Sequence, residues 1–427
     1  MLLLFEVGME KLLITGKQRL YGEIIISGMK NSALPIIFAC LLVPDDCIIK
    51  NIPHVSDVEN SLEILRSMGV KAEFVDKNTV LINAKYAKNE IAKMELVSKM
   101  RASSYLMGTM LSRFGKVDIS MPGGCNFGAR PLDLHFKGFE KMGAIFTEKS
   151  DKIQIKVNKS LKCSKITLDK ISVGATINMV LASALTQGET IIENVALEPH
   201  VDDLICFLQH CGAEIVRKNN SIVVRGVKRL HGTEYTIMPD TIEALTYLTY
   251  LGITGGYLNL KGICPSHLEC ATDIFLKIGM SINFAQRSIL AKVDKQLTGT
   301  DVTTSPYPGF PTDLHPQFAS LLSFCKGGGS ITEMVFPTRF KYVYELQKAG
   351  VQIYNRDNIA IINESKPHSA VLDATDLRAG AGLVGVALGA EGESTINNVN
   401  YIVRGYENLV EKLSSVGGKI KIIKGEN

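Results

Sequence analysis

One cysteine of this chain stands in a setting that favours chemistry. The segment MPGGCNFGARPLDLH, residues 121–135, places Cys125 directly after two glycines, and Arg130 follows five residues later. A neighbouring arginine lowers the pKa of a thiol, which makes that thiol a better nucleophile and a ready acid. The glycines permit a mobile loop, and Pro131 can occupy the first position of a helix. Taken alone, the window is also compatible with a surface turn that happens to hold a thiol.

Cationic side chains recur where helices are expected to begin. They are Lys30, Arg101, Arg130, Arg339, Arg378 and Arg404. A helix N-terminus presents unpaired N–H groups and the positive end of a dipole, so it favours anions. Several cations at such positions repel one another unless a multiply anionic ligand balances them, and the arginine fork suits carboxylate and phosphate. For any single residue of the set, a solvated charge at a helix end is the simpler interpretation.

A long-period repeat makes these positions equivalent. A helix, a glycine, an apolar residue and a strand recur in this order six times, with the glycines at Gly69, Gly143, Gly212, Gly279, Gly350 and Gly417. The intervals between successive glycines are nearly equal along the whole chain. A glycine here is typical of a helix C-terminus that needs a left-handed backbone. The period therefore predicts six copies of one structural unit.

Each copy has the same internal order of elements. A first helix such as GATINMVLASAL is apolar on all sides, which predicts burial, whereas a second helix such as DVENSLEILRSM has a polar face. Strands precede and follow these helices. We expect an α/β fold of two inside-out domains, each made of three βαβαββ repeats with buried helices and outer sheets. Two ordinary doubly wound α/β domains are the alternative.

The direction of the buried helices decides where the cations lie. If all helices of one domain point the same way, their N-termini open onto a single face. Two such faces would then form an interdomain cleft that carries the six cationic residues. This geometry is an expectation from the repeat and does not follow from any single motif.

Composition is that of an ordinary globular protein. The chain has 427 residues, 46% of them apolar and 21% charged, and a net charge of +4. This length predicts two domains, and this charge is too small to indicate a nucleic-acid or membrane partner. Nine cysteines without a C-x-x-C pair favour a reducing cytoplasm over disulfides or a zinc site. Residues 1–8 are expected to be an N-terminal extension, too short for a signal peptide, and either Met1 or Met9 begins the protein.

Eight motifs resemble, in order and spacing, those of the UDP-N-acetylglucosamine 1-carboxyvinyltransferase family of enolpyruvyl transferases. They are SGMKNSALPI, MRASSYLMG, MPGGCNFGARPLDLH, DKISVGAT, FPTDLHPQF, TEMVFPTRF, ATDLRAGAGLV and RGYENLVEKL, and the resemblance covers residues 9–424. It implies the same inside-out α/β fold. It also implies one domain of residues 30–238, with Cys125 on a lid loop. Residues 9–29 and 239–427 would form the second domain, with Asp313, Arg378 and Arg404.

The resemblance implies a reaction as well. The enolpyruvyl group of phosphoenolpyruvate would pass to the 3-hydroxyl of UDP-N-acetylglucosamine by addition and elimination, with release of phosphate. This is the first committed step of peptidoglycan precursor synthesis in the cytoplasm. No metal and no organic cofactor is expected. The expected partners are the two small-molecule substrates, with no nucleic acid and no membrane, and we expect a monomer.

The family motifs assign roles to particular residues. Cys125 would donate a proton to the methylene carbon, and Asp313 would accept the proton of the sugar hydroxyl. Taken alone, Asp313 could also be a helix N-cap, and the two roles can coexist. The expected phosphoenolpyruvate-binding residues are Lys30, Asn31, Arg130, Arg339, Arg378 and Arg404, with Lys30, Arg130 and Arg404 leaning toward the phosphate. Those expected to bind UDP-N-acetylglucosamine are Arg101, Arg130, Pro131, Leu132, Asp133, Leu134, Lys170, Ser172, Val173, Gly174, Asp313 and Val335. His135 could serve either the site or helix packing.

The chain departs from the family pattern in two places. The resemblance implies an arginine where this sequence has Leu197 and another where it has Thr241. These departures leave room for a catalytically silent paralogue that binds the nucleotide sugar. The remaining alternative is the sibling enzyme 5-enolpyruvylshikimate-3-phosphate synthase, although the Cys125 loop and the DKISVGAT motif speak against it.

Overall fold

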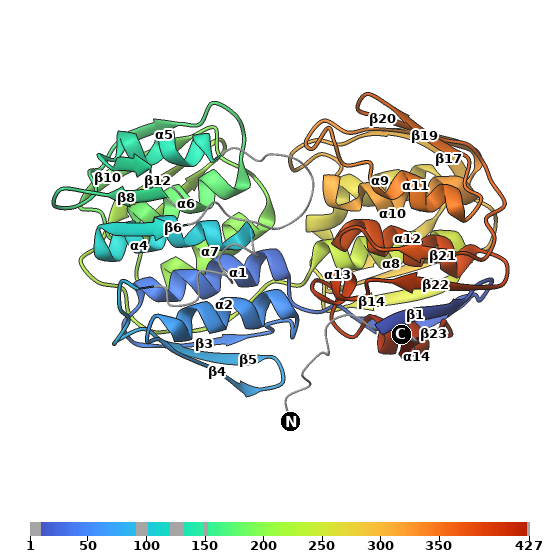
Figure 1. The fold of residues 1–427 in the computed structure, drawn as a ribbon, viewed down its shortest axis with the longest axis horizontal. Helices are drawn as coiled ribbons and strands as arrows, with labels where there is room; N and C mark the ends of the chain where they lie inside the picture. Colours follow the sequence, from blue (N-terminus) through green and yellow to red (C-terminus); the bar gives the residue numbers. More distant parts are fainter. Residues whose placement is uncertain (1–9, 91–100, 120–131, 149–152, 425–427) are drawn as a thin grey trace. The chain divides into compact units, whose positions relative to one another are not determined.

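The computed structural model describes residues 10–90, 101–119, 132–148 and 153–424. These residues fall into two compact units (Figure 1). Residues 28–238, where described, form what we call the N unit, and residues 10–27 and 239–424 form the C unit. The chain passes from the C unit to the N unit after Ser27 and returns after Met238.

Long apolar helices form the interior of both units. In the N unit they are α1 (Lys30–Ala39), α4 (Leu106–Phe114) and α6 (Val173–Ser183), and in the C unit α8 (Thr241–Thr254), α10 (His315–Phe324) and α12 (Leu377–Gly389). Every residue of α12 is buried, and Asn31 is the one residue of α1 that is not. Because these helices have no polar face, they are stable only when other elements surround them.

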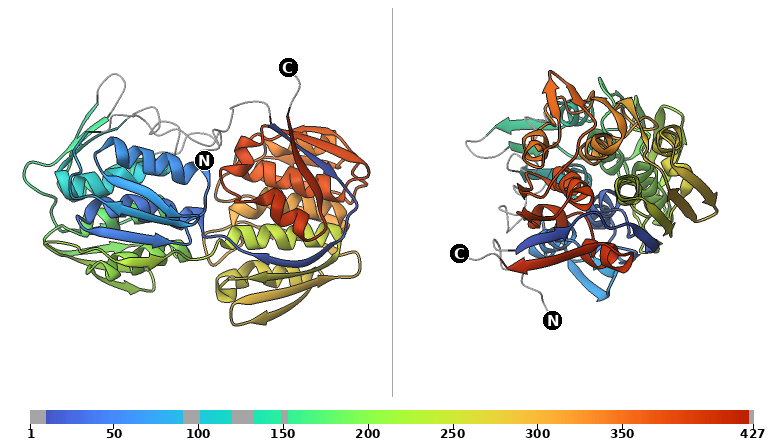
Figure 2. Two further views of the ribbon diagram at one scale, coloured as in Figure 1. Left: turned by 90° about the horizontal axis from the view of Figure 1, so that it is seen from below. Right: turned by 90° about the vertical axis from the view of Figure 1, so that its right-hand side faces the viewer.

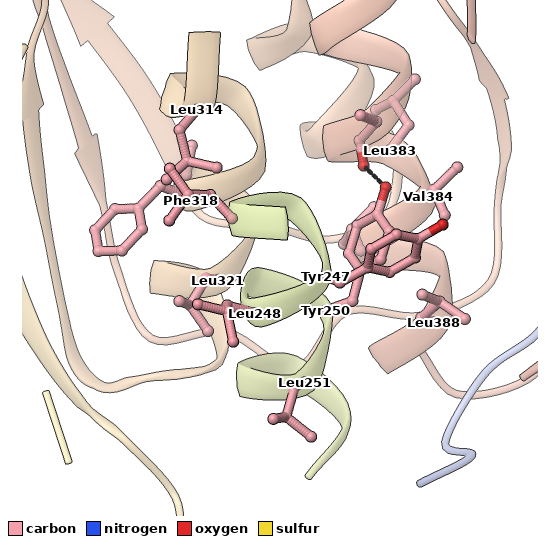
Figure 3. Close-up of a cluster of buried hydrophobic side chains, with 14 of the residues drawn as sticks. Tyr247, Leu248, Tyr250, Leu251, Leu314, Phe318, Leu321, Leu383, Val384 and Leu388 are labelled. Atoms are coloured by element: carbon pink, nitrogen blue, oxygen red, sulfur yellow. Dashed lines mark hydrogen bonds between the residues drawn. The ribbon is translucent and has the colours of Figure 1, made fainter. Parts of the chain in front are cut away.

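The core of the C unit shows how these helices pack. Side chains of α8, α10 and α12 interlock, with Tyr247 and Tyr250 facing α12 (Figure 3). The Tyr250 hydroxyl donates to the carbonyl of Ala381 at 2.8 Å, so the ring is buried without an unsatisfied polar group. Each fully buried large side chain in such a core contributes about 1.5–3 kcal/mol to the stability.

Amphipathic helices cover this interior, and each ends at one of the repeat glycines. They are α2 (Ser56–Ser67), α5 (Asp133–Lys141), α7 (Pro199–His210), α9 (Glu269–Lys277), α11 (Tyr342–Lys348) and α14 (Leu409–Ser415). The glycine that follows each helix has a φ between +80° and +106°, a conformation that side chains strain. Shorter helical segments are η1 (Cys40–Leu42), η2 (Arg101–Tyr105), η3 (Pro265–Leu268), η4 (Thr312–Leu314) and α13 (Asn400–Val403).

The strands of the described residues form six sheets, three in each unit. In the first sheet of the N unit the strand order is β13 (Glu234–Thr236), β3 (Asp46–Lys50), β5 (Thr79–Asn83), β4 (Lys71–Asp76). In the second it is β9 (Lys165–Thr167), β10 (Gly188–Glu193), β12 (Ser221–Gly226), β11 (Glu214–Lys218). In the third it is β6 (Lys116–Ile119), β8 (Ile153–Lys156), β7 (Ile145–Glu148). In the C unit the strand orders are β2 (Leu20–Ile25), β14 (Gly256–Lys261), β16 (Ser288–Val293), β15 (Ser281–Ala285); β17 (Thr298–Thr303), β18 (Lys326–Thr332), β20 (Ile359–Ile362), β19 (Ile353–Arg356); and β21 (Val371–Asp373), β22 (Glu393–Asn397), β1 (Glu10–Thr15), β23 (Lys419–Lys424).

All four-stranded sheets share one pairing scheme. The first two strands in each order are parallel and the other pairs are antiparallel, as in the parallel register Tyr257↔Tyr21 and the antiparallel register Leu258↔Ala291. Burial alternates along the strands, so that Ile289 and Ala291 of β16 are buried whereas Leu290 between them is exposed. One sheet face therefore packs inward and the other faces solvent, with strands outside the helices (Figure 2). The predicted inside-out α/β architecture is confirmed.

The N-terminal segment completes two sheets of the C unit. Strand β1 lies between β22 and β23, with Leu12 opposite both Ile396 and Ile422, and β2 pairs with β14. Conversely, β13 adds to β3 in the N unit just before the chain leaves it. The C unit therefore forms only when both ends of the chain come together.

Two further predictions concern cysteines and membranes. The seven cysteines whose side chains are described are free thiols, and Cys40, Cys47, Cys211 and Cys325 are buried among apolar residues. Within the described ranges, no helix combines the length and apolarity needed to cross a bilayer.

Candidate active site

Charged side chains converge at Asp313 in the C unit. Its Oδ1 lies 2.9 Å from Nη1 of Arg339, and its Oδ2 lies 3.2 Å from Nη2 of Arg378. Arg339 and Arg378 are only 3% and 4% exposed, whereas the Asp313 side chain keeps 27% of its surface. We call these three residues the Asp313 cluster. Two of the predicted cations and the predicted base are thus brought together.

The direction of the central helices brings Asp313 and Arg378 together. Asp313 lies in η4 directly before α10, and Arg378 is the second residue of α12. Further along the same helices, the Ser320 hydroxyl donates to the carbonyl of Gly382 at 2.7 Å. Contacts at the start and in the middle of both helices mean that α10 and α12 run parallel. The repeat predicted this shared direction within a domain.

Electrostatics in the Asp313 cluster favour the ionised carboxylate. Burial by itself raises the pKa of Asp313, but the positive charges of Arg378 and Arg339 outweigh it and hold the pKa well below its usual value. Burial likewise disfavours the charged Arg378, and the surrounding Tyr406 and Asp313 more than compensate, so its pKa is raised. A carboxylate in this state is a weak base until something else engages the arginines.

The additional role of Asp313 as a helix cap, which could have coexisted with that of a base, is wrong. The N-cap position of α10 is Leu314, and no side chain among the described residues caps this helix. The preceding turn, η4, provides the transition into α10 instead. The Asp313 carboxylate is therefore used for the two arginines and not for backbone N–H groups.

Tyr406 fixes the position of Arg378. Its hydroxyl accepts hydrogen bonds from Nη1 of Arg378 and from Nε2 of Gln317, both at 3.0 Å, and lies 3.0 Å from Oγ1 of Thr246. The Tyr406 ring is 1% exposed. Burial raises the pKa of its hydroxyl, so Tyr406 stays neutral and acts as a hydrogen-bonding anchor.

Arg404 and Val335 lie on loops of the same unit. Arg404 is the C-cap of α13, so the prediction that a helix begins there is wrong. It is half-buried and two residues from Tyr406. The next residue, Gly405, packs against the start of α12, since a Cβ there would come within 2.5 Å of Leu377. Val335 is half-buried and follows β18, four residues before Arg339.

In the N unit a single buried ion pair marks the start of α1. Lys30 Nζ lies 2.8 Å from Oδ2 of Asp57, and the two side chains are 10% and 6% exposed. Lys30 is the first residue of α1, and Asp57 lies in the first turn of α2. Asn31 is half-buried beside Lys30. A buried ammonium at a helix N-terminus is stable only with a carboxylate of this kind nearby.

The start of α6 carries three of the described residues predicted to bind the nucleotide sugar, Ser172, Val173 and Gly174. Ser172 is the N-cap, and its hydroxyl accepts from the N–H of Ala175 at 3.3 Å. Gly174 lies so close to the His135 ring that a Cβ would be 3.2 Å from it. His135 is 6% exposed, and its Nδ1 lies 2.9 Å from Nδ2 of Asn178. His135 therefore packs α5 against α6, the second of its two predicted roles.

Other predicted residues near α5 and α6 differ in exposure. Lys170 and Asp133 are exposed, Val173 and Leu134 are half-buried, and Leu132 is buried at the N-cap of α5. Cys125, Arg130 and Pro131 lie outside the described residues. Arg101 begins η2, and its side chain is not among those described.

Three residues of these sites were not predicted from the sequence: Asp57, Tyr406 and Glu333. Asp57 precedes the glycine of its repeat by almost the same interval as Arg130 and Arg404 precede theirs. The same interval points to Asp57, but at the second helix of each repeat the prediction names arginines alone. Tyr406 belongs to the quoted motif RGYENLVEKL, and Glu333 to TEMVFPTRF. Nothing in the sequence separates these two from ordinary buried residues.

The described residues place no group of three or more His, Cys, Asp or Glu side chains in an arrangement that could hold a metal ion. The charged groups that the C unit brings together at the Asp313 cluster are an arginine pair and one carboxylate. Such a pair can bind an anion that carries a carboxylate or phosphate, and it leaves Asp313 free to accept a proton when the anion replaces it.

The fold and these residues define an enolpyruvyl transferase scaffold. Residues 14–413 match the family model of EPSP synthase (3-phosphoshikimate 1-carboxyvinyltransferase), and the chain belongs to this family. The predicted family resemblance is confirmed.

The more similar relatives within this family carry a narrower name. A protein of Finegoldia magna is 39% identical over 98% of this chain, and one of Endomicrobium trichonymphae is 40% identical over 97%. Both are covered completely, and both are named UDP-N-acetylglucosamine 1-carboxyvinyltransferase.

Solved structures agree with the fold. The enolpyruvyl transferase NikO of Streptomyces tendae is 26% identical, with a TM-score of 0.89 over 98% of this chain and all of that one. An EPSP synthase of Acinetobacter baumannii is 18% identical with a TM-score of 0.70 over 97% of this chain and all of that one, and it shows the shared fold alone.

Proposed function

We propose that this chain transfers the enolpyruvyl group of phosphoenolpyruvate to the 3-hydroxyl of UDP-N-acetylglucosamine and releases phosphate. The names of relatives about 40% identical over the whole chain support this substrate pair. The observation that carries the proposal is the Asp313 cluster, in which a partly exposed carboxylate is bound by two buried arginines. A base and an anion-binding pair are then adjacent, as addition of an alcohol to an anionic donor requires.

The addition step uses two proton transfers. Asp313 accepts the proton of the sugar hydroxyl while that oxygen bonds to C2 of phosphoenolpyruvate. Cys125 donates a proton to C3, which converts the double bond into a methyl group and yields a tetrahedral ketal. The Cys125 thiolate then takes a proton back from C3 while the bond from C2 to the phosphate oxygen breaks, which restores the double bond. The proton on Asp313 leaves with the phosphate. No electron carrier or metal takes part in these steps.

Phosphoenolpyruvate would replace Asp313 as the partner of Arg339 and Arg378. We assign its carboxylate to Arg378 and Arg339, and its phosphate to Lys30, Arg130 and Arg404, with Asn31 as a further hydrogen-bonding group. When the donor carboxylate takes up Arg378 and Arg339, their hold on Asp313 weakens and the pKa of Asp313 rises toward its ordinary value. Donor binding would thus convert a weak base into a useful one.

The acceptor would lie on the N unit residues named from the motifs. We assign its diphosphate to the start of α6, where Ser172, Val173 and Gly174 present backbone N–H groups. Arg101, Lys170 and residues 130–134 would contact the rest of the nucleotide, and Asp313 and Val335 of the C unit the sugar. These contacts, and the use of Cys125 on a lid, are parts of the proposal.

We also propose where the enzyme acts, its oligomeric state and its domain boundaries. The enzyme would act in the cytoplasm as a monomer, on peptidoglycan precursors, without cofactor, metal, nucleic acid or membrane. Residues 30–238 and residues 9–29 with 239–427 would be its two domains, and residues 1–8 an extension.

One assay tests the substrate choice. Phosphate release from phosphoenolpyruvate is measured with UDP-N-acetylglucosamine and, separately, with shikimate 3-phosphate. Release with the nucleotide sugar only is the expected result. Release with shikimate 3-phosphate only would show the other activity of the family, the one in the name of the family model. Binding of the nucleotide sugar without release would show a silent paralogue.

A second experiment tests the thiol. An epoxide phosphonate inhibitor should alkylate the wild-type chain once, and Cys125→Ser should abolish the labelling. Persistent labelling of this variant would place the reactive thiol at another cysteine.

A further inference from the structure

A buried carboxylate that the proposed reaction does not use lies directly behind the Asp313 cluster. Glu333 follows β18 and is 0% exposed. Its Oε1 accepts from the Thr304 hydroxyl and from the N–H groups of Val335 and Phe336, each at 2.8 Å. Its Oε2 accepts from the Thr312 hydroxyl at 2.9 Å and faces Nδ1 of His315 at 3.0 Å. Five donors on one buried carboxylate make it a rigid anchor.

Thr312 connects this anchor to Arg339. Since the Thr312 hydroxyl donates its proton to Glu333, its oxygen is turned to accept from Nη1 of Arg339, 2.8 Å away. The same Nη1 also donates to the Thr312 carbonyl at 2.6 Å and to Oδ1 of Asp313 at 2.9 Å. The orientation of the Thr312 hydroxyl thus depends on Glu333, and this hydroxyl is one of three acceptors that position Nη1 of Arg339.

Phe336 provides a second connection. Its N–H is held by Glu333, and its ring centre lies 5.2 Å from the guanidinium carbon of Arg339. The Glu333 carboxylate is therefore connected to Arg339 in two ways. One is the Thr312 hydroxyl, and the other is the Phe336 ring, against which the guanidinium packs.

His315 completes the anchor as a neutral group. Its Nε2 lies 2.7 Å from the Tyr342 hydroxyl, and both side chains are buried. Burial lowers the pKa of His315 despite the adjacent Glu333, so the ring donates from Nδ1 to Glu333 and accepts from Tyr342 at Nε2. Both nitrogens of the His315 ring are hydrogen-bonded, so the ring is fixed and its Nδ1 holds Oε2 of Glu333 in place.

We propose that Glu333 is a positioning residue that holds Arg339 against Asp313 through Thr312 and the turn at 335–336. The kinetic part of this inference rests on the proposed function, in which Arg339 binds the donor. Glu333 touches neither substrate, and its effect passes through the position of Arg339.

Glu333→Gln tests the inference with a matched control. An amide in place of the carboxylate presents an NH₂ group to at least one of the five donors, so the Thr312 hydroxyl turns and Arg339 loses an acceptor. We expect the KM for phosphoenolpyruvate to rise by about 10-fold or more, with a smaller change in the KM for UDP-N-acetylglucosamine. The control is Glu345→Gln. Glu345 is also buried in the C unit and accepts from the N–H of Asp373 at 2.8 Å, but it contacts no residue of the Asp313 cluster in the described structure.

A pair of variants at Thr312 provides a rescue. Thr312→Val removes the hydroxyl and should raise the KM for the donor in the same direction, whereas Thr312→Ser keeps the hydroxyl and should restore it. If Glu333→Gln does not fold, the two Thr312 variants test the inference by themselves. Donor KM values that are equal in the Val and Ser variants, or in Glu333→Gln and Glu345→Gln, overturn the inference.

A structural readout separates this inference from the proposed function. If the wild-type chain releases no phosphate with either acceptor, the proposed function fails, and crystal structures of Thr312→Val and Glu333→Gln decide the inference alone. Arg339 displaced from Asp313 supports the positioning role. Arg339 Nη1 still about 2.9 Å from Oδ1 of Asp313 in both variants overturns it.

Discussion

The two units build their buried helices alike but begin them differently. In the C unit, α8 and α12 are capped by carboxylates: Asp240 accepts from the N–H groups of Ile242 and Glu243, and Asp376 from those of Arg378 and Ala379. In the N unit, α6 is capped by one hydrogen bond of 3.3 Å to the Ser172 hydroxyl. The described side chains provide no cap for α1.

This difference separates two ways of binding anions on one scaffold. At the starts of α8 and α12 the carboxylate caps already use the N–H groups and oppose the helix dipoles, so attraction of an anion there depends on arginine side chains. The third buried helix of the C unit, α10, has no cap from a described side chain. In the N unit the helix starts keep their positive character, and backbone N–H groups can serve directly. The same repeat therefore provides two kinds of hydrogen-bond donor for anions, arginine side chains in the C unit and backbone N–H groups in the N unit. Single substitutions test whether the two units differ in this way.

The largest effect is expected from Asp313→Asn. The amide keeps the shape of the side chain but removes both the base and the charge that balances Arg339 and Arg378. We expect kcat for phosphate release to fall by about 10²–10⁴-fold, the usual contribution of a general base. Asp301→Asn is the control, because Asp301 is exposed and accepts from the hydroxyl of Ser330 on the neighbouring strand. Activity of Asp313→Asn close to wild type would exclude Asp313 as the base.

Lys30→Met should have the largest effect on stability in the N unit. The substitution leaves the buried Asp57 carboxylate without the ammonium 2.8 Å away, and breaking a buried pair in this way costs about 3–5 kcal/mol. The free energy of unfolding is measured in urea. Lys261→Met breaks the pair with Glu23, whose side chains are 46% and 56% exposed, and should cost far less. Equal losses would mean that burial of the Lys30–Asp57 pair contributes nothing.

Acid should weaken the C unit through Glu333. Although burial raises the pKa of Glu333, hydrogen bonds from His315 and its other donors lower it to about 2, below the value of about 4.3 in an unfolded chain. The folded chain then binds fewer protons between these two values. Its stabilisation is complete above about pH 4.3 and is lost as the pH falls toward 2, by about 3 kcal/mol in total.

Urea unfolding between pH 6 and 2 measures this loss. Glu333→Gln should be less stable than the wild type at pH 6, and the difference should shrink as the pH falls. Asp313→Asn should show the same trend, because the pKa of Asp313 is also depressed. A constant difference over the whole range would contradict the depressed pKa values.

A smaller effect is expected from Tyr406→Phe. Arg378 and Gln317 both lose an acceptor in a buried place, which costs about 1–3 kcal/mol. Because Arg378 becomes less fixed, the KM for phosphoenolpyruvate should rise while the midpoint of thermal unfolding falls. Tyr344→Phe is the control, since Tyr344 is 66% exposed. A lower stability with an unchanged KM would show that Tyr406 does not position Arg378.

The smallest effects compare the helix caps of the two units directly. Asp240→Ala removes two hydrogen bonds of 2.8 and 3.0 Å from the start of α8, and Ser172→Ala removes one of 3.3 Å from α6. Each cap contributes about 0.5–2 kcal/mol, and we expect Asp240→Ala to cost more. Unfolding in urea provides the measurement. A larger loss for Ser172→Ala would reverse the contrast between the units.

Much of the architecture was available from the sequence because its causes are local. A glycine at positive φ is required wherever a helix ends in this way, so six such glycines reveal six repeats. Helices without a polar face must be buried. The same periodic count found Lys30 and Arg378 because both lie in the first turn of a buried helix, whereas Arg339 lies in the loop three residues before α11. It did not name Asp57, because at the second helix of each repeat the prediction named arginines alone.

Tertiary structure alone decided which charges meet. Asp313 and Arg378 are 65 residues apart, and Lys30 and Asp57 are 27 residues apart, so their pairing depends on how parallel helices align in each unit. The anchoring of Arg339 through Thr312 and Glu333 depends on the direction of a single hydroxyl. The sequence by itself determined the repeat, the buried helices and the family. Hydrogen bonds between distant segments are set by packing, and only the folded chain specifies them.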